Sequence, residues 1–200
     1  INKDVPTTEE ALSGARDIIA ETISENAAVR DNLRQHFIRK AFISSQVVKG
    51  KEEEAATYRD YFDFSEQIKK CKPHRLMAMM RGDKEGLLRV RVTVETEEME
   101  DIVAKRFVKS RNKAAEQVTI ALKDSCKRLL APSMETETLN YYKELADDEA
   151  IKVFASNLRQ LLMMPPAGEK RIMGIDPGFR TGCKVVCLDE HGNLLHHETI

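Results

Sequence analysis

The feature that most constrains the fold is a change in the spacing of apolar residues at Pro165-Pro166. Before this pair, apolar side chains recur every three or four positions over most of the chain, which is the period of an amphipathic helix. After it, short apolar runs alternate with turns that contain glycine, a pattern typical of strands. Because proline cannot continue a helical hydrogen-bond ladder, we predict a helical region over residues 1–166 and a separate strand-rich segment over residues 167–200.

Two helices are predicted in the first 45 residues. Thr7-Thr8-Glu9-Glu10 has the pattern of a capping box, in which a Thr hydroxyl accepts a hydrogen bond from a free backbone N–H. Asp31 is the predicted N-cap of the second helix. The residues expected to face inward on that second helix are Leu33, Phe37, Ile38, Ala41 and Phe42.

A small β element is predicted in the middle of the helical region. Apolar and polar residues alternate from Leu88 to Val94, the period of a strand with one buried face. Before it, Pro73 is suited to the first turn of a helix, which Gly82 is expected to end. The signal between residues 44 and 72 is weak, with one short strand expected at residues 46–48.

Helical spacing returns after the β element. We predict helices over residues 99–107 and 115–129, a break at Pro132, and two further helices, the second capped by Asp147 or Asp148. Three strands with tight connections should follow Pro165. The predicted fold class is therefore mainly α: a helical domain with a small β element, followed by a truncated α/β segment that opens as a β-hairpin.

Charge and cysteine content limit the classes of function. The formal net charge is -1, so any contact with a polyanion must come from local clusters of Lys and Arg. Two such clusters are present, one over residues 30–40 and one over residues 69–75 that includes Arg75. A solvated helix face is the ordinary interpretation of such clusters, and phosphate neutralisation is the alternative.

The chain contains four cysteines but no Cys-x-x-Cys pair, so we expect reduced thiols rather than a zinc site. It contains no apolar run of membrane-spanning length and no signal peptide at its start. A cytoplasmic protein with no membrane partner is therefore expected. Both ends of the sequence have the character of internal positions, which predicts a fragment of a longer protein.

The most informative motif is the segment from Gly174 to Gly182, which places Asp176 at the end of a buried strand before a loop bounded by glycines. A carboxylate in that position can hold Mg²⁺ beside a phosphate, and two such metals can promote phosphodiester cleavage. Asp-Pro-Gly is also an ordinary turn sequence. Asp176 is therefore a candidate catalytic and metal-binding residue, with any further acids of the site lying after Ile200.

Several motifs together resemble the Tex family of transcription accessory proteins, and residues 172–189 resemble the opening strands of its YqgF-type, RNase H-like domain. The resemblance extends over essentially the whole chain. The motifs that carry it are Gly14-Ala15-Arg16-Asp17-Ile18, Tyr61-Phe62, His74-Arg75, Arg81-Gly82, Glu85-Gly86, Asp148-Glu149-Ala150-Ile151, Val153-Phe154-Ala155, Asn157-Leu158, Pro165-Pro166-Ala167-Gly168 and the Gly174–Gly182 segment.

The resemblance implies a segment of a bacterial transcription factor that binds RNA or DNA mainly through a C-terminal OB-fold domain absent here, with the transcription machinery as a further partner. It implies a scaffold without catalysis and without a cofactor, since the family's YqgF-type domain is not expected to keep a full set of catalytic acids. Arg75, Arg180 and Lys184 are the residues we assign to nucleic-acid contact. The alternatives are a nuclease or Holliday-junction resolvase that uses Mg²⁺ at Asp176, and a nucleotide-binding kinase or ATPase.

Overall fold

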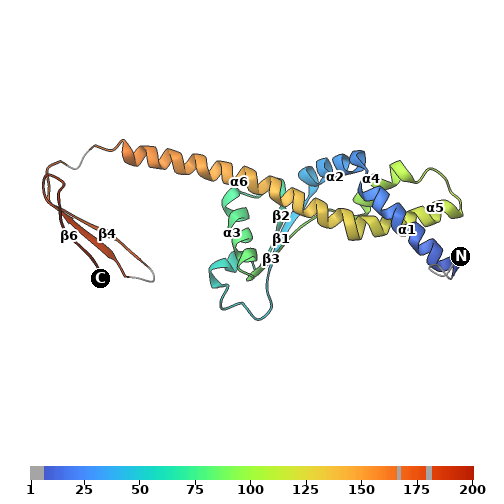
Figure 1. The fold of residues 1–200 in the computed structure, drawn as a ribbon, viewed down its shortest axis with the longest axis horizontal. Helices are drawn as coiled ribbons and strands as arrows, with labels where there is room; N and C mark the ends of the chain where they lie inside the picture. The colour runs from blue at the N-terminus through green and yellow to red at the C-terminus, as the bar shows by residue number, and fades with distance from the viewer. Residues whose placement is uncertain (1–6, 166–167, 179–181) are drawn as a thin grey trace. The chain divides into compact units, whose positions relative to one another are not determined.

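The computed structural model describes residues 7–165, 168–178 and 182–200, and Figure 1 labels most of their helices and strands. The chain divides into two compact units, Ile1–Val153 and Phe154–Ile200. The fold is mainly helical, with one small antiparallel sheet among the helices and a second one at the C-terminal end. The predicted fold class is thereby confirmed.

The first unit opens with α1 (Thr8–Ser24) and α2 (Ala27–Lys40). The predicted cap of α1 is present, because the Thr7 hydroxyl accepts a hydrogen bond from the Glu10 backbone N–H at 3.2 Å. The predicted cap of α2 is wrong. Asn26 caps this helix by accepting from the Val29 N–H at 3.1 Å, whereas the Asp31 carboxylate accepts from Arg34.

The small β element is a three-stranded antiparallel sheet in the order β2-β1-β3. Its strands are β1 (Phe42–Val47), β2 (Asp63–Gln67) and β3 (Leu88–Thr93). The sequence indicates β3 clearly, but it placed Phe42 on the inner face of a helix. Phe42 instead begins β1 and its side chain is 51% exposed, because α2 ends at Lys40 and Ala41 has extended backbone angles.

Short 3-10 helices η1 (Ala56–Tyr61) and η2 (Ile68–Lys70) flank β2, and α3 (Pro73–Lys84) precedes β3. Pro73 occupies the first turn of α3 as predicted. Gly82 does not end α3, since the helix continues to Lys84 and the positive φ that favours glycine occurs at Gly86. Gly82 lies inside the helix because its missing side chain leaves room for Leu88 of β3.

The last helices of this unit are α4 (Thr96–Phe107) and α5 (Lys113–Asp124), followed by a π-helical segment η3 (Ser125–Leu130) and α6 (Ala131–Leu162). Two predicted breaks are absent. Pro132 lies in the first turn of α6 directly after the wide turns of η3, where the hydrogen-bond ladder is already shifted. Asp147 does not cap a new helix, because its carboxylate accepts from Lys143 on the same helix at 2.6 Å.

One hydrophobic cluster joins the helices to the inner face of the first sheet. Its fully buried side chains come from α1, α2, β1, η2, α3, β3, α4, α5, η3 and α6, and the many helices among them explain the long runs at helical spacing. The largest of these side chains are Phe37, Ile23, Leu33, Ile43, Ile68, Met79, Leu122, Leu130 and Met134. No helix in the described ranges is long and apolar enough to cross a bilayer.

The second unit contains the last turns of α6 and a three-stranded antiparallel sheet in the order β4-β5-β6. Its strands are β4 (Ile172–Asp176), β5 (Lys184–Leu188) and β6 (Leu194–Thr199), as the sequence predicted. The β5–β6 turn is closed by Asp189, whose carboxylate accepts from the backbone N–H groups of His191 and Asn193. The hydrogen bond from the Asn193 side chain, followed by these backbone hydrogen bonds, lowers the pKa of Asp189.

Candidate nucleic-acid interface

Asp176 is the last residue of β4 and lies directly opposite Lys184 of β5. Lys184 in turn lies opposite Thr199 of β6, so the three side chains share one face at this end of the sheet. The structure therefore brings together two of the residues predicted from sequence. Arg180 lies outside the described residues.

Among the described residues, the side chains opposite Asp176 on the neighbouring strands are not of the kinds that hold magnesium. Its cross-strand neighbour is a cation and the next is a hydroxyl, whereas Mg²⁺ prefers several oxygen ligands, usually carboxylates and phosphates. Within residues 7–165, 168–178 and 182–200, no three His, Cys, Asp or Glu side chains converge on a point where a metal could bind. A lone carboxylate opposite a lysine is suited to an ion pair or a solvated turn.

Arg75 belongs to the first unit, where its position on α3 gives it a structural partner. Its Nη1 lies 3.6 Å from Oε1 of Glu66 on β2, and the Glu66 side chain is only 22% exposed. Burial, together with a hydrogen bond to Glu66, raises the pKa of the neighbouring Cys71 thiol to about 12. Arg75 thus compensates a half-buried carboxylate between α3 and the sheet.

The first basic cluster is split by its contacts with α6. Arg30 and Arg34 both pair with Glu137, and Arg30 also donates to the Ser133 hydroxyl at 2.7 Å. These two cations therefore tie α2 to α6 and are not available to a ligand. Arg39 and Lys40, at the end of α2, are exposed, and neither pairs with an acid in the part of the chain that the structure describes.

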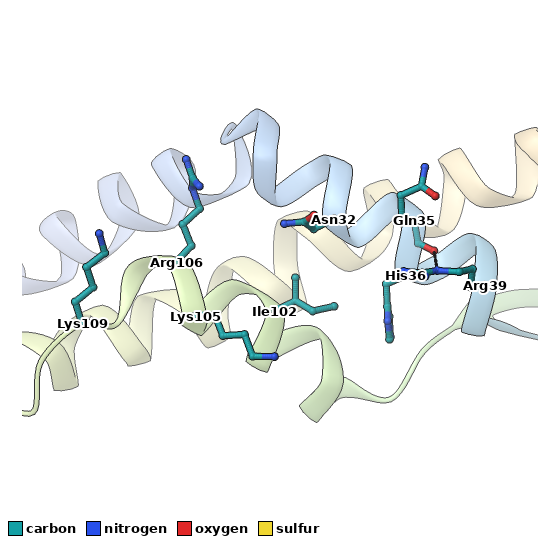
Figure 2. A pocket seen from close by; sticks show the side chains of 8 residues that line it. All are labelled: Asn32, Gln35, His36, Arg39, Ile102, Lys105, Arg106 and Lys109. Atoms are coloured by element: carbon teal, nitrogen blue, oxygen red, sulfur yellow. Dashed lines mark hydrogen bonds between the residues drawn. The ribbon is translucent and has the colours of Figure 1, made fainter.

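A groove of about 590 Å³ lies between α2 and α4. On α2 the lining residues are spaced i, i+3, i+4 and i+7, which is one face of the helix. On the other side, three lining residues share one face of α4 and Lys109 lies just beyond its end. Figure 2 shows that the two sets run in opposite directions along the groove, with Arg39 at one end and Lys109 at the other. The lining residues are Asn32, Gln35, His36, Arg39, Ile102, Lys105, Arg106 and Lys109.

Positive charge dominates this groove. Arg39, Lys105, Arg106 and Lys109 are exposed, and Arg39 is held in place by donating from Nε to the Gln35 carbonyl at 3.1 Å (Figure 2). Glu98 contacts the lining, because its Oε2 lies 2.9 Å from Nε2 of the half-buried His36, without the alignment of a hydrogen bond. The groove is therefore suited to an anion that follows its length.

The cations continue beyond the end of α4. Residues 105–113 include five of them, and no acid occurs between Asp101 and Glu116. Lys105 and Arg106 can be explained by the negative end of the α4 dipole. The dipole of α4 does not explain the exposed cations that follow the end of α4, which are Lys109, Arg111 and Lys113.

This segment was not among the sites predicted from the sequence, although five cations in nine residues is a signal that a charge count in short windows detects. The cations of α2 were predicted as a cluster, but their neighbours on α4 were not. The groove becomes apparent only when the two helices are packed, since residues 39 and 105 are far apart in the chain.

Comparison with known proteins agrees with this fold. A family model described as Tex central region-like matches residues 1–154, and one described as Tex protein YqgF-like domain matches residues 170–200. The chain is 38% identical, over 98% of its length, to the transcriptional accessory protein Tex of Neisseria gonorrhoeae, and 38% identical, over 99%, to the uncharacterized protein YdcI of Bacillus subtilis.

A more distant relative is the human S1 RNA-binding domain-containing protein 1, which is 26% identical over 99% of this chain. The chain spans only 27% of the Neisseria protein, 28% of the Bacillus protein and 21% of the human one. The matched segments are the same in kind as those expected from the sequence motifs, a helical central region and the opening strands of a YqgF-like domain. The chain belongs to the Tex family.

Proposed function

We propose that this chain is a nucleic-acid-binding scaffold segment of a transcription accessory protein, and that it contacts phosphates through the groove between α2 and α4. The observation that carries the proposal is the set of exposed, unpaired cations along this groove, Arg39, Lys105, Arg106 and Lys109, among the residues that the structure describes. The names of two relatives, one transcriptional and one RNA-binding, support the same class of function.

The chemistry of the groove favours contact with the backbone of RNA or DNA over readout of bases. Its polar lining consists of cations, two amides and one imidazole, and its apolar residue, Ile102, has no π face on which a base could stack. Such a surface binds without sequence preference, typically with a Kd of about 10⁻⁴–10⁻⁶ M at physiological salt. We assign any tighter binding by the whole protein to domains outside this chain. We also propose that the whole protein contacts the transcription machinery.

The test is the salt dependence of binding to a labelled 20-base-pair DNA, measured by fluorescence anisotropy. The triple substitution K105Q/R106Q/K109Q should reduce the slope of log K against log[salt] by about 2–3, because each lost phosphate contact removes about 0.9. The matched control is K49Q/K84Q/K127Q, which neutralises three exposed cations elsewhere on the same unit. An equal reduction of the slope in both variants would show that only net charge matters, and it would contradict the proposal that the groove binds the phosphates.

We further propose that the chain is not an enzyme and needs no cofactor. The alternative is a metal-dependent nuclease or resolvase with Asp176 as its first ligand, and the cross-strand position of Lys184 argues against it. The assay is cleavage of branched DNA, duplex DNA and single-stranded RNA with Mg²⁺ or Mn²⁺, applied to the chain and to the intact protein. Turnover that disappears in Asp176→Asn would overturn the scaffold proposal and favour the nuclease.

We also place the protein in the cytoplasm. Cys71, Cys126, Cys183 and Cys187 are all free thiols, as is usual in a reducing compartment. Burial and the nearby charge of Glu100 raise the pKa of Cys126 to about 12, which keeps this core thiol protonated. Fractionation of cells that express the intact protein would test the assignment.

A further inference from the structure

The first sheet has one covered face and one open face. On the central strand β1, Ile43 and Ser45 are fully buried against the core, whereas Phe42 and Gln46 are exposed and Ser44 is half-buried. Side chains alternate between the faces of a strand, so Phe42, Ser44 and Gln46 stand in a row on the open face. An exposed phenylalanine on the central strand of a sheet calls for an explanation, since burial of such a ring is worth about 2–3 kcal/mol.

The neighbours of this row are polar or positive. On β3, Thr93 lies opposite Phe42, Arg91 opposite Ser44 and Arg89 opposite Gln46. All three are exposed, and Arg91 keeps 62% of its side chain accessible although it pairs with Glu135 at 3.2 Å. On β2, the residues opposite the same row are Gln67, Ser65 and Asp63. Asp63 is the one acid among these nine residues of β1, β2 and β3, and it lies opposite Gln46, at the end away from Phe42.

More cations gather at the Phe42 end of the sheet. The Gln67 side chain donates to the Arg39 carbonyl at 2.8 Å, and the Ile68 N–H donates to the Ala41 carbonyl at 2.9 Å. These two hydrogen bonds place η2, with its exposed residues Lys69 and Lys70, next to the end of α2 and Lys40. Lys69 and Lys70, which begin the second basic cluster of the sequence, thus lie at the Phe42 end of the sheet.

We infer that the open face of this sheet is a binding platform for single-stranded nucleic acid, in which one base stacks on Phe42 while Arg89 and Arg91 contact phosphates. A contiguous apolar patch is the usual mark of a surface that binds a protein partner, whereas here a single aromatic ring is surrounded by hydroxyls, amides and cations. Single-strand binders combine this pair of features, a ring for stacking and cations for the backbone. A duplex keeps its bases stacked on one another and offers none to the ring.

The inference rests on the proposed function in one respect, that nucleic acid is the ligand of the chain. The two surfaces are built from different residues, so they can be tested separately. The groove between α2 and α4 contacts phosphates of either a duplex or a single strand. The sheet adds a contact that only a single strand can make.

The chain contains no tryptophan, so Phe42→Trp introduces a single indole at the proposed stacking position, which can be excited at wavelengths where the four tyrosines absorb little. Titration with a twelve-nucleotide oligo(U) RNA should quench its fluorescence, and a twelve-base-pair duplex should not. The matched control is Phe154→Trp, which replaces another exposed phenylalanine outside the sheet. Quenching of both variants by the single strand, or of neither, would overturn the inference.

Affinity gives an independent readout. Phe42→Ala should weaken binding of the oligo(U) RNA by about five- to 150-fold, the loss expected for one stacked base, and should change duplex binding by less than about twofold. Phe154→Ala should change neither, and circular dichroism verifies folding of each variant. If Phe42→Ala binds single strands like the parent chain while K105Q/R106Q/K109Q still weakens binding, the inference fails and the proposed function stands. If both sets of substitutions are without effect, both fail.

Discussion

At the scale of single residues, contacts decide which charges of a basic cluster can bind a ligand. Arg30, Arg34 and Arg39 look alike in the sequence, but the first two converge on Glu137 and the third faces the groove. Burial opposes ionisation of Glu137. The hydrogen bond from Arg34 and the charges of Arg30 and Arg34 outweigh that effect, so the pKa of Glu137 lies below its ordinary value of 4.5.

A pH-dependent stability follows from Glu137. A depressed carboxyl pKa stabilises the folded state above the ordinary value of 4.5, and the contribution is lost as the pH falls through the folded-state pKa. Glu137→Gln should therefore lower the free energy of unfolding by about 1–2 kcal/mol at pH 7, and by progressively less below pH 4.5. Urea denaturation at a series of pH values measures both quantities.

The matched control for Glu137→Gln is Glu144→Gln. Glu144 lies two helical turns further along α6 and is exposed. Its substitution should leave the unfolding free energy within about 0.5 kcal/mol of the parent at every pH. A pH-independent loss in Glu137→Gln would show that the carboxylate contributes through packing rather than through its charge.

At the scale of elements, the contact between α3 and β3 depends on a glycine inside a helix. A Cβ added at Gly82 would lie 2.7 Å from Cδ1 and 2.8 Å from Cγ of Leu88, whose side chain is 2% exposed. Such distances are too short for carbon atoms in contact. The strand can therefore approach α3 only because position 82 has no side chain.

We predict opposite effects for two Gly→Ala substitutions in helices. Gly14→Ala on α1, where nothing lies within 4 Å of the new Cβ, should stabilise the protein by about 1 kcal/mol through helix propensity. Gly82→Ala should destabilise it by about 1–2 kcal/mol, because overpacking outweighs the same gain in propensity. Thermal unfolding of the two variants in one buffer compares them directly. Stabilisation by both would mean that Leu88 moves aside at little cost.

At the scale of the whole molecule, the boundary at which the helical domain ends remains a prediction. The helical domain was predicted to end near Pro165, and the compact unit ends at Val153 within α6. Every residue of α6 from Ile151 to Leu162 is exposed, so these last turns add little to the core of either unit.

We expect limited trypsin digestion to cut first after Lys170 or Arg171, which precede β4 and lie outside any helix or strand. The backbone there makes few local hydrogen bonds that must open before cleavage, unlike that of α6. Mass spectrometry should identify an N-terminal product of about 170 residues whose thermal unfolding midpoint matches that of the whole chain. First cuts at Lys152 or Arg159 would instead place the boundary inside α6.

The sequence by itself determined the kinds of elements. Apolar spacing identified most of the helices, the alternation in β3 and the three C-terminal strands, because amphipathic periodicity reflects which face of an element is buried. Several motifs together also indicated the family. Element boundaries were less certain, since a local cap such as Asp31 or a break such as Pro132 competes with alternatives that depend on neighbouring turns.

Only the tertiary structure decided where the candidate sites lie. The exposure of Phe42 depends on where α2 ends, and the groove depends on packing α4 beside α2, so neither follows from local spacing. Arg30 is neutralised by an acid more than a hundred residues away, while Lys109 is not. The exposure of a ring and the availability of a charge depend on which segments pack together, and the sequence does not show which distant segments become neighbours.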